Sequence, residues 1–120
     1  MPLIDTPMLR ALGRFLDVNA FRETLVASNM ANIDTPGYRT RDVNFQAELA
    51  RAAGWESSGG DAAPPVARTL DGLVARPDGN NVSAEREGLL LAETQLRFHL
   101  GTELVRAQFR QLATAINEGK

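Results

Sequence analysis

The chain has 120 residues, a formal net charge of −2, one histidine and no cysteine, and 43% of its residues are hydrophobic. This length fits one small domain, and the near-neutral charge lacks the basic field with which proteins bind nucleic acids. Without cysteine, disulfides, thiolate zinc sites and cysteine nucleophiles are excluded, and the single His99 cannot build a multi-histidine metal site.

The first predicted element is a long amphipathic helix over about residues 5–32. Thr6 or Asp5 can cap its start, and Pro7 suits a first helical turn because its missing N–H would be unpaired there anyway. Polar Asn19 and Glu23 share a stripe with apolar residues at steps of three and four. These apolar residues are Leu9, Leu12, Leu16, Val26, Met30 and Ile33. The polar interruptions favour a seam that meets a partner helix over a dry core.

A turn is predicted where this helix ends, in the run Asp34-Thr35-Pro36-Gly37-Tyr38. Pro36 disfavours helix at Thr35, and Gly37 readily takes a positive φ, so the Pro-Gly order favours a type II turn. The Asp34 side chain is placed to accept backbone N–H groups just ahead of it.

Two asparagines, Asn29 and Asn32, occupy the last turn of the same helix. Asparagine tolerates left-handed geometry and bonds locally, which suits a helix end. A helix end does not require two asparagines in the same turn, however. We therefore expect their amides to pair with backbone groups of an adjacent chain.

The middle of the chain is predicted to be a short helix followed by a linker. Phe45 and Leu49 are four residues apart in a helix over residues 44–53, with Gly54 as its stop. Residues 54–81 are rich in Gly and Pro and have the composition of a flexible linker. Residues 1–53 and 82–120 are expected to form one structural domain across this linker.

The last predicted element is a second long helix, from the N-cap Ser83 to about Asn117. Glu85 and Glu87 suit its first turn, where carboxylates interact well with the helix N-terminus. A stripe typical of a coiled-coil seam runs along it, consisting of Leu91, Phe98, Val105, Phe109, Leu112 and Ile116. The fold class is therefore all-α, with two long amphipathic helices packed as a coiled-coil-like hairpin.

A second apolar row lies on roughly the opposite side of this helix and consists of Leu89, Leu96, Leu100, Leu104 and Ala107. A helix that is apolar on two faces needs neighbours on two faces. The sequence has no other long amphipathic helix to cover the second face, so we expect contacts between chains. The alternative is that the short helix around Phe45 and Leu49 folds back over this row.

The sequence predicts no catalytic, cofactor-binding or metal site. His99 lies between Phe98 and Leu100 without a partner ligand, and the helix glutamates alternate with arginines as on an ordinary solvated face. No glycine-rich loop follows a strand to cradle a phosphate. No apolar run reaches the 18 residues that favour a membrane span, and the amino-terminal region lacks the apolar core of a secretory signal.

Residues 25–49, LVASNMANIDTPGYRTRDVNFQAEL, resemble the amino-terminal signature of bacterial flagellar rod, hook and hook-associated proteins. The continuation Arg41-Asp42-Val43-Asn44-Phe45 and the later run GNNVSAEREGLLLAETQLRFHL, residues 79–100, are most similar to the FlgB family of proximal-rod proteins. Departures are small: Met30 stands where Ile or Leu is commoner, Ile33 where Ala is common and Ser83 where an acidic residue is frequent.

The resemblance implies a structural subunit of the proximal rod in the flagellar basal body, in the periplasm. Members travel through the flagellar type III export apparatus without a cleaved signal. Their implied partners are copies of themselves, other rod proteins, the export apparatus and the basal-body base. The residues implied to fix the chain reversal and the subunit contacts are Ser28, Asn29, Ala31, Asn32, Asp34, Thr35, Pro36, Gly37 and Tyr38. The alternatives are another rod or hook-associated protein, or a soluble helical adaptor that binds one partner helix.

Overall fold

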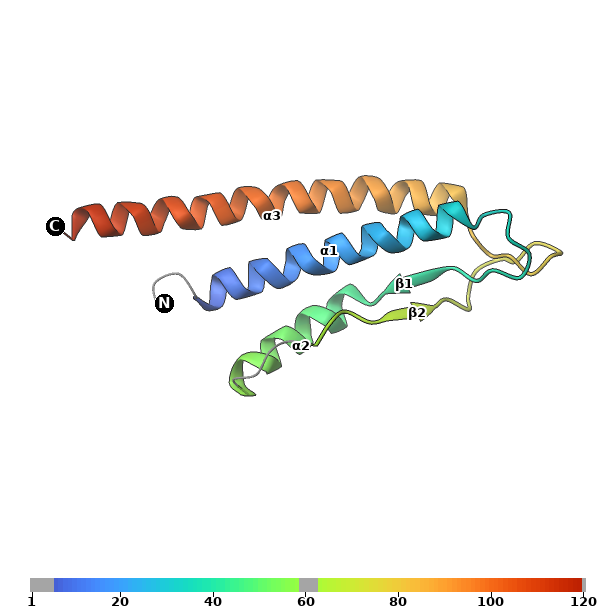
Figure 1. Ribbon diagram of the computed structural model, residues 1–120, viewed down its shortest axis with the longest axis horizontal. Helices are drawn as coiled ribbons and strands as arrows, with labels where there is room; N and C mark the ends of the chain where they lie inside the picture. Colours follow the sequence, from blue (N-terminus) through green and yellow to red (C-terminus); the bar gives the residue numbers. More distant parts are fainter. Residues whose placement is uncertain (1–5, 59–62, 120) are drawn as a thin grey trace.

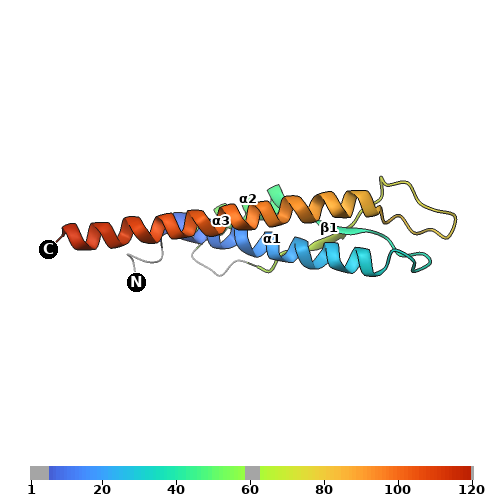
Figure 2. The same cartoon turned by 90° about the horizontal axis from the view of Figure 1, so that it is seen from above.

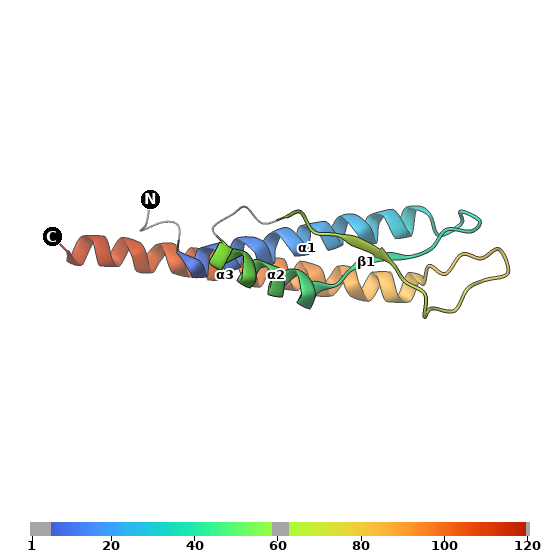
Figure 3. The same ribbon diagram turned by 90° about the horizontal axis from the view of Figure 1, so that it is seen from below.

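The computed structural model describes residues 6–58 and 63–119, and only the backbone of residues 52–58. The elements follow in the order α1 (Pro7–Ala31), β1 (Arg41–Val43), α2 (Phe45–Ser58), β2 (Ala67–Thr69) and α3 (Ala84–Glu118). The molecule is long and flat, with extents of 68 × 29 × 17 Å. Helices α1 and α3 lie side by side and antiparallel, and α2 and the strands lie along the other side of α1 (Figures 1 and 3).

Helix α1 begins and ends where the sequence predicts. The Thr6 hydroxyl caps its start by accepting a hydrogen bond from the Leu9 N–H at 3.1 Å; the alternative cap, Asp5, lies outside the described residues. Leu12 and Val26 of the predicted stripe are buried, but Met30 at its end is exposed. The stripe therefore departs from the prediction at Met30, which is 42% exposed, whereas Ile33 is half-buried.

A buried apolar cluster lies between α1 and the sheet, in addition to the buried Leu12 and Val26 of the stripe. It contains Val18, Leu25 and Val43, and Phe21, Phe45 and Ala67 pack against it. The rings of Phe15 and Phe45 meet edge to face with centroids 5.5 Å apart, which fixes the start of α2 on α1. The sequence pattern missed this core because Val18 and Leu25 lie off the stripe that faces α3.

The middle segment has more regular structure than the linker composition predicts. Asn44 caps α2, its side-chain oxygen accepting from the Ala47 N–H at 3.0 Å, and α2 then runs through the predicted stop at Gly54 to Ser58. A glycine within a helix costs only about 1 kcal/mol, so it does not by itself end one. Within the predicted linker, β2 pairs antiparallel with β1, Arg41 opposite Thr69 and Val43 opposite Ala67.

Helix α3 turns a different line toward α1 from the one that the heptad stripe predicts. Ser83 is the N-cap as predicted, its hydroxyl accepting from the Arg86 N–H at 3.2 Å. The residues of α3 that are buried are Glu87, Thr94 and Gly101. Of the predicted seam, Leu91, Val105 and Leu112 are half-buried and Phe98, Phe109 and Ile116 are 40–54% exposed. The predicted seam therefore does not mark the line of α3 that lies against α1. That line consists of small and polar residues, which let the two helices approach closely, and the bulky residues of the predicted seam flank it.

Part of the exposure of Phe109 and Ile116 follows from helix length. Helix α3 has 35 residues and α1 has 25, so α3 is 10 residues longer (35 − 25). Its carboxyl end extends past the start of α1 (Figures 1 and 2). The last turns of α3 therefore lack α1 as a neighbour.

Replacing Gly101 by leucine is expected to destabilise the fold. A Cβ at this position would lie 2.7 Å from Leu16 Cδ2 and 3.0 Å from Phe15 Cδ1, so a large side chain forces α1 and α3 apart. Overpacking of this kind costs about 1–3 kcal/mol. Gly88→Leu, on the same helix, is the matched control, because a Cβ at Gly88 would meet nothing within 4 Å. Denaturant unfolding should show a lower midpoint for Gly101→Leu only; equal midpoints for the two variants would contradict the close approach.

Candidate functional site

The predicted turn forms at Thr35 to Tyr38. Gly37 has φ 76°, and the Tyr38 N–H donates to the Thr35 carbonyl at 3.2 Å, as a type II turn requires. The Asn32 side-chain oxygen accepts from the Thr35 hydroxyl at 3.0 Å and ties the turn to the end of α1. The positive φ expected for Gly37 is confirmed.

A second loop, formed by residues 76–83, folds onto this turn, although it lies far downstream in the sequence. The Gly37 N–H donates to the Asp78 carbonyl at 2.9 Å. The Asn80 amide donates to the carbonyls of Asn32 at 2.9 Å and Thr35 at 2.8 Å. Asn80 therefore adds a second hydrogen bond to each of two carbonyls that already accept a backbone N–H, the Asn32 carbonyl from Thr35 and the Thr35 carbonyl from Tyr38. The two motifs form one structure, which we call the motif junction (residues 28–42 and 76–83).

Asn81 joins the junction to the sheet. Its side-chain oxygen accepts from the Thr40 N–H at 2.6 Å, and its amide donates to the Leu70 carbonyl at 3.0 Å. One side chain thus bridges the ends of the two chain segments that form the ladder. Asn80 and Asn81 are fully buried. Sequence reasoning missed both, although two asparagines close together were the signal that drew attention to Asn29 and Asn32.

Asn29 is fully used inside its own chain. Its amide donates to the Arg41 carbonyl at 2.8 Å and to Glu87 Oε2 at 3.2 Å. Its oxygen accepts from the Arg41 N–H at 3.1 Å and from the Tyr38 hydroxyl at 3.0 Å. The Asn32 amide likewise donates to the Ser28 carbonyl, at 2.8 Å. The expected pairing of these amides with an adjacent chain is therefore corrected: they hold the turn, β1 and α3 on α1.

A buried charge cluster lies next to Asn29. The Asp42 carboxylate accepts two hydrogen bonds from Arg22 of α1, both at 3.0 Å, and one from Arg86 of α3 at 2.7 Å. Arg86 also donates to the buried Glu87 at 2.9 Å. Burial raises the pKa of Asp42, but the hydrogen bonds from Arg22, the Val43 N–H and Arg86 outweigh it, so that pKa lies below 3.8. The cluster therefore joins α1, β1 and α3 through charge-assisted bonds.

The remaining motif residues divide between the junction and the surface. The hydroxyls of Ser28 and Tyr38 are hydrogen-bonded at 3.3 Å, so these two side chains belong to the junction. The residues exposed to solvent are Ala31, Asp34, Thr35, Pro36 and Gly37. Ser28, Asn32 and Tyr38 are half-buried, and Asn29 is the motif residue that is fully buried.

The second row of α3 is uncovered in the single chain. Leu89 and Leu96 are each 70% exposed, Leu100 is 53% and Leu104 is 44%. Phe45 packs on Phe15 and beneath the Arg97 guanidinium, whose carbon lies 4.8 Å from the ring centroid. The alternative that the short helix folds back over the row is therefore wrong: α2 packs on α1.

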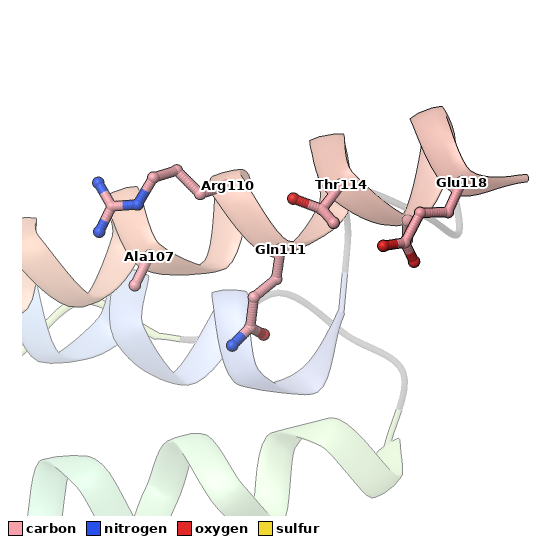
Figure 4. A pocket seen from close by; sticks show the side chains of 6 residues that line it. Ala107, Arg110, Gln111, Thr114 and Glu118 are labelled. Atoms are coloured by element: carbon pink, nitrogen blue, oxygen red, sulfur yellow. The ribbon is translucent and has the colours of Figure 1, made fainter.

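The end of α3 carries a shallow surface hollow that all comes from this one helix (Figure 4). Its lining residues are Ala107, Arg110, Gln111, Thr114, Ala115 and Glu118. Among the residues that the structure describes, no group of three or more His, Asp or Glu side chains is placed to hold a metal ion. Over the same residues, no helix is long and apolar enough to cross a membrane.

Comparison with known proteins identifies the family. No protein-family model matches the chain. A flagellar basal body rod protein FlgB of Cereibacter sphaeroides is 37% identical over 79% of the chain and 82% of its own length. FlgB of Salmonella typhimurium is 30% identical over 92% of the chain and 94% of its own length. FlgB of Borrelia hermsii is 31% identical over 86% of the chain and 90% of its own length. The chain belongs to the FlgB family of flagellar basal body rod proteins. With 92% of the chain aligned to a FlgB, the likeness covers far more than the motif junction alone.

In this FlgB-family chain, Gly37→Val is expected to disrupt the turn and so to reduce rod assembly. A β-branched residue resists the φ of 76°, and leaving the left-handed region pulls the Gly37 N–H from the Asp78 carbonyl. Gly72→Val is a control in a loop where φ is not positive. Rods counted in purified basal bodies should fall for Gly37→Val and not for Gly72→Val. Equal counts would show that the turn does not need glycine.

Proposed function

We propose that this chain is a structural subunit of the proximal rod, which assembles through helix–helix contacts into the torque-transmitting rod of the flagellar basal body. The observation that carries the proposal is the exposed leucine row of α3 in a chain of the FlgB family. An apolar row of this length on a helix normally marks a surface that another protein covers. Copies of the chain and other rod proteins are its proposed neighbours.

The arrangement of the chain suits a mechanical part. The pair of α1 and α3 is proposed to act as a coiled-coil-like hairpin, and the motif junction is proposed to hold its end rigid through hydrogen bonds that are mostly part-buried. Close-packed elements of this kind transmit strain because they compress little. The exposed motif residues, Ala31, Asp34, Thr35 and Pro36, are proposed subunit contacts at that end.

The proposed location is the base of the rod in the periplasm, next to the basal-body base. We expect the chain to reach it through the flagellar type III export apparatus, without a cleaved signal peptide. The proposal needs no catalytic residue, cofactor or metal, and no nucleic acid or membrane insertion.

The proposal is tested by deleting the gene in its own bacterium. The deletion strain should make no complete rod and should not swim in soft agar, and the wild-type gene on a plasmid should restore both. Electron micrographs of purified basal bodies show directly whether the rod is complete. A deletion strain that swims normally, with no second copy of the gene to compensate, would show that the chain is not a rod subunit.

A further inference from the structure

We propose that Glu48 is a latch that holds an arm of the chain, residues 46–58 and 63–66, closed on α1. When the latch opens, the arm leaves α1 as one unit, while α1, α3 and the motif junction stay folded. The inference concerns a change of shape within a single chain, so it goes beyond the proposed function and does not depend on the partners of a rod subunit.

The contact between α2 and α1 is centred on a charged residue. Over residues 45–51, the part of α2 whose side chains the structure describes, only Glu48 is buried; Phe45 and Leu49 are half-buried and the others are exposed. Helix α2 lies at the edge of the molecule and packs on α1 (Figure 1). Because the free energy gained from apolar burial grows with the apolar area buried, this helix gains little from it. Its attachment therefore depends on the bonds that Glu48 makes.

The Glu48 carboxylate joins three parts of the chain. Its Oε1 accepts a hydrogen bond from Arg14 of α1 at 3.2 Å and lies 3.2 Å from the guanidinium of Arg51, one turn along α2. Its Oε2 accepts from the Val66 N–H, just before β2, at 3.1 Å. Arg51 also donates to two carbonyls of residues 63–66, at 3.4 and 3.3 Å. The two pieces of the arm are therefore tied to each other, and Glu48 ties both to α1.

The ion pair between Arg14 and Glu48 fixes the position of the arm without adding much stability. The side chains are only 7% and 4% exposed, so closing the arm takes two charges out of water. Within the described residues, the buried Arg14 Nε has no hydrogen-bond partner, so the guanidinium recovers only part of the bonding that it has in water. Desolvation offsets most of the attraction in buried pairs of this kind. Opening the arm returns both charges to water, which lowers its cost in free energy.

The two ends of the arm are anchored separately. Phe45 and Ala67, the residues next to it, pack against the apolar cluster of Val18, Leu25 and Val43. They therefore mark the places where the chain can bend.

The remaining elements are held by bonds in which the arm takes no part. Strand β1 is fixed by Asn29 of α1, which donates to the Arg41 carbonyl, and by Arg86 of α3, which donates to Asp42. The Asn81 side chain holds the chain beyond β2. Regions with few buried apolar contacts open at a lower free energy than the whole fold. The arm is such a region, and the boundary follows its anchored ends.

Glu48→Gln opens the latch without changing the size of the side chain. In the closed arm both carboxylate oxygens accept bonds, one from the two arginines and the other from the Val66 N–H. A glutamine has one oxygen and one NH2 group, so in either orientation it turns a donor toward a donor. It also leaves the buried Arg14 without an opposite charge, which favours the open arm.

The experiment is amide hydrogen exchange on the whole chain under native conditions. In the wild type, the amides of Ala50 and Arg51 in the arm should be less protected than those of Val26 in α1 and Thr94 in α3. In Glu48→Gln, the arm amides should exchange faster by a common factor of at least about ten. The protection of Val26 and Thr94 should change only as much as the global stability, measured by urea unfolding.

Glu103→Gln is the matched control. It makes the same chemical change in an ion pair with Arg106 on the surface of α3, where the two side chains are 45% and 64% exposed. Exchange in the arm should match that of the wild type. Arg51→Met, at a 44% exposed position, is a milder variant for the case that Glu48→Gln does not fold, and it should speed the same arm amides by a smaller common factor.

Four results would overturn the proposal. The first is a wild-type arm as well protected as Val26 and Thr94. The second is a change in Glu48→Gln at the Val66 N–H alone, whose bond the substitution removes directly. The third is an equal increase in exchange for the arm and the helix pair, which is global unfolding. The fourth is exchange in the arm that neither Glu48→Gln nor Arg51→Met alters.

Discussion

Asp42→Ala is expected to lower the free energy of unfolding by about 3–5 kcal/mol, the cost of leaving buried charges without their partner. In the folded chain Asp42 accepts bonds from Arg22 and Arg86, whose side chains are only 14% and 26% exposed. Removal of the carboxylate leaves the partly buried Arg22 guanidinium without this partner, while Arg86 keeps its bond to Glu87 and loses the bond to Asp42. Urea unfolding at neutral pH measures the effect, and Asp71→Ala, at an exposed position, is the control with the same change of charge. A loss as small as that of the control would mean that the cluster does not hold the fold.

The same carboxylate predicts how stability depends on pH. Its pKa in the folded chain lies below 3.8, so the folded state favours the charged form more than the unfolded state does. The stabilisation is therefore present above the unfolded value of about 4 and is lost as pH falls through the folded pKa. The stability difference between wild type and Asp42→Asn should shrink in unfolding experiments below about pH 4. A difference that stays constant from neutral pH to pH 3 would exclude this account.

Asn29→Ala is expected to cost about 3 kcal/mol or more, because it breaks several bonds at one buried position. The substitution leaves the Arg41 N–H and carbonyl without their partner and takes a donor from the buried Glu87 carboxylate. It also removes the oxygen that accepts from the Tyr38 hydroxyl at 3.0 Å, although that hydroxyl keeps its contact with Ser28. Each buried group left unsatisfied costs about 1–3 kcal/mol.

The control for Asn29→Ala is Asn117→Ala, at an exposed position near the end of α3. Its unfolding midpoint should stay close to that of wild type. Amide hydrogen exchange adds a local measurement, since the Arg41 N–H bonds to the Asn29 oxygen at 3.1 Å. Exchange at Arg41 should be faster in Asn29→Ala than expected from the loss of global stability alone. If neither the unfolding midpoint nor the exchange rate of the Arg41 N–H changes in Asn29→Ala, water replaces the Asn29 side chain without a cost in free energy.

Local chemistry explains which parts of the fold the sequence could predict. Thr6 and Ser83 cap helices because a short hydroxyl side chain can reach the N–H groups of the first turn. Gly37 takes its positive φ because a residue without a Cβ does so cheaply. These outcomes depend on residues close in sequence, and each was predicted correctly.

The errors share a physical cause, which is partners far apart along the chain. Strand β2 forms only because β1 is there to pair with it, and Gly54 stays helical because it is not a strong enough stop. The line of α3 that faces α1 is set by Phe15 and Leu16, which fit against Gly101 and not against a leucine. Apolar periodicity shows where the bulky residues lie on a helix, but not which line of the helix a neighbour approaches.

By itself, the sequence determined the two long helices, their caps, the turn at Gly37 and the leucine row that leaves α3 apolar on more than one side. It also carried the likeness to flagellar rod proteins, which the FlgB relatives confirm. Only the tertiary structure decided that Asn29, Asn80 and Asp42 belong to one junction, and that the leucine row stays open. The reason is that buried amides and carboxylates are stable only with partners, and those partners lie up to 58 residues away, as for Asn29 and Glu87.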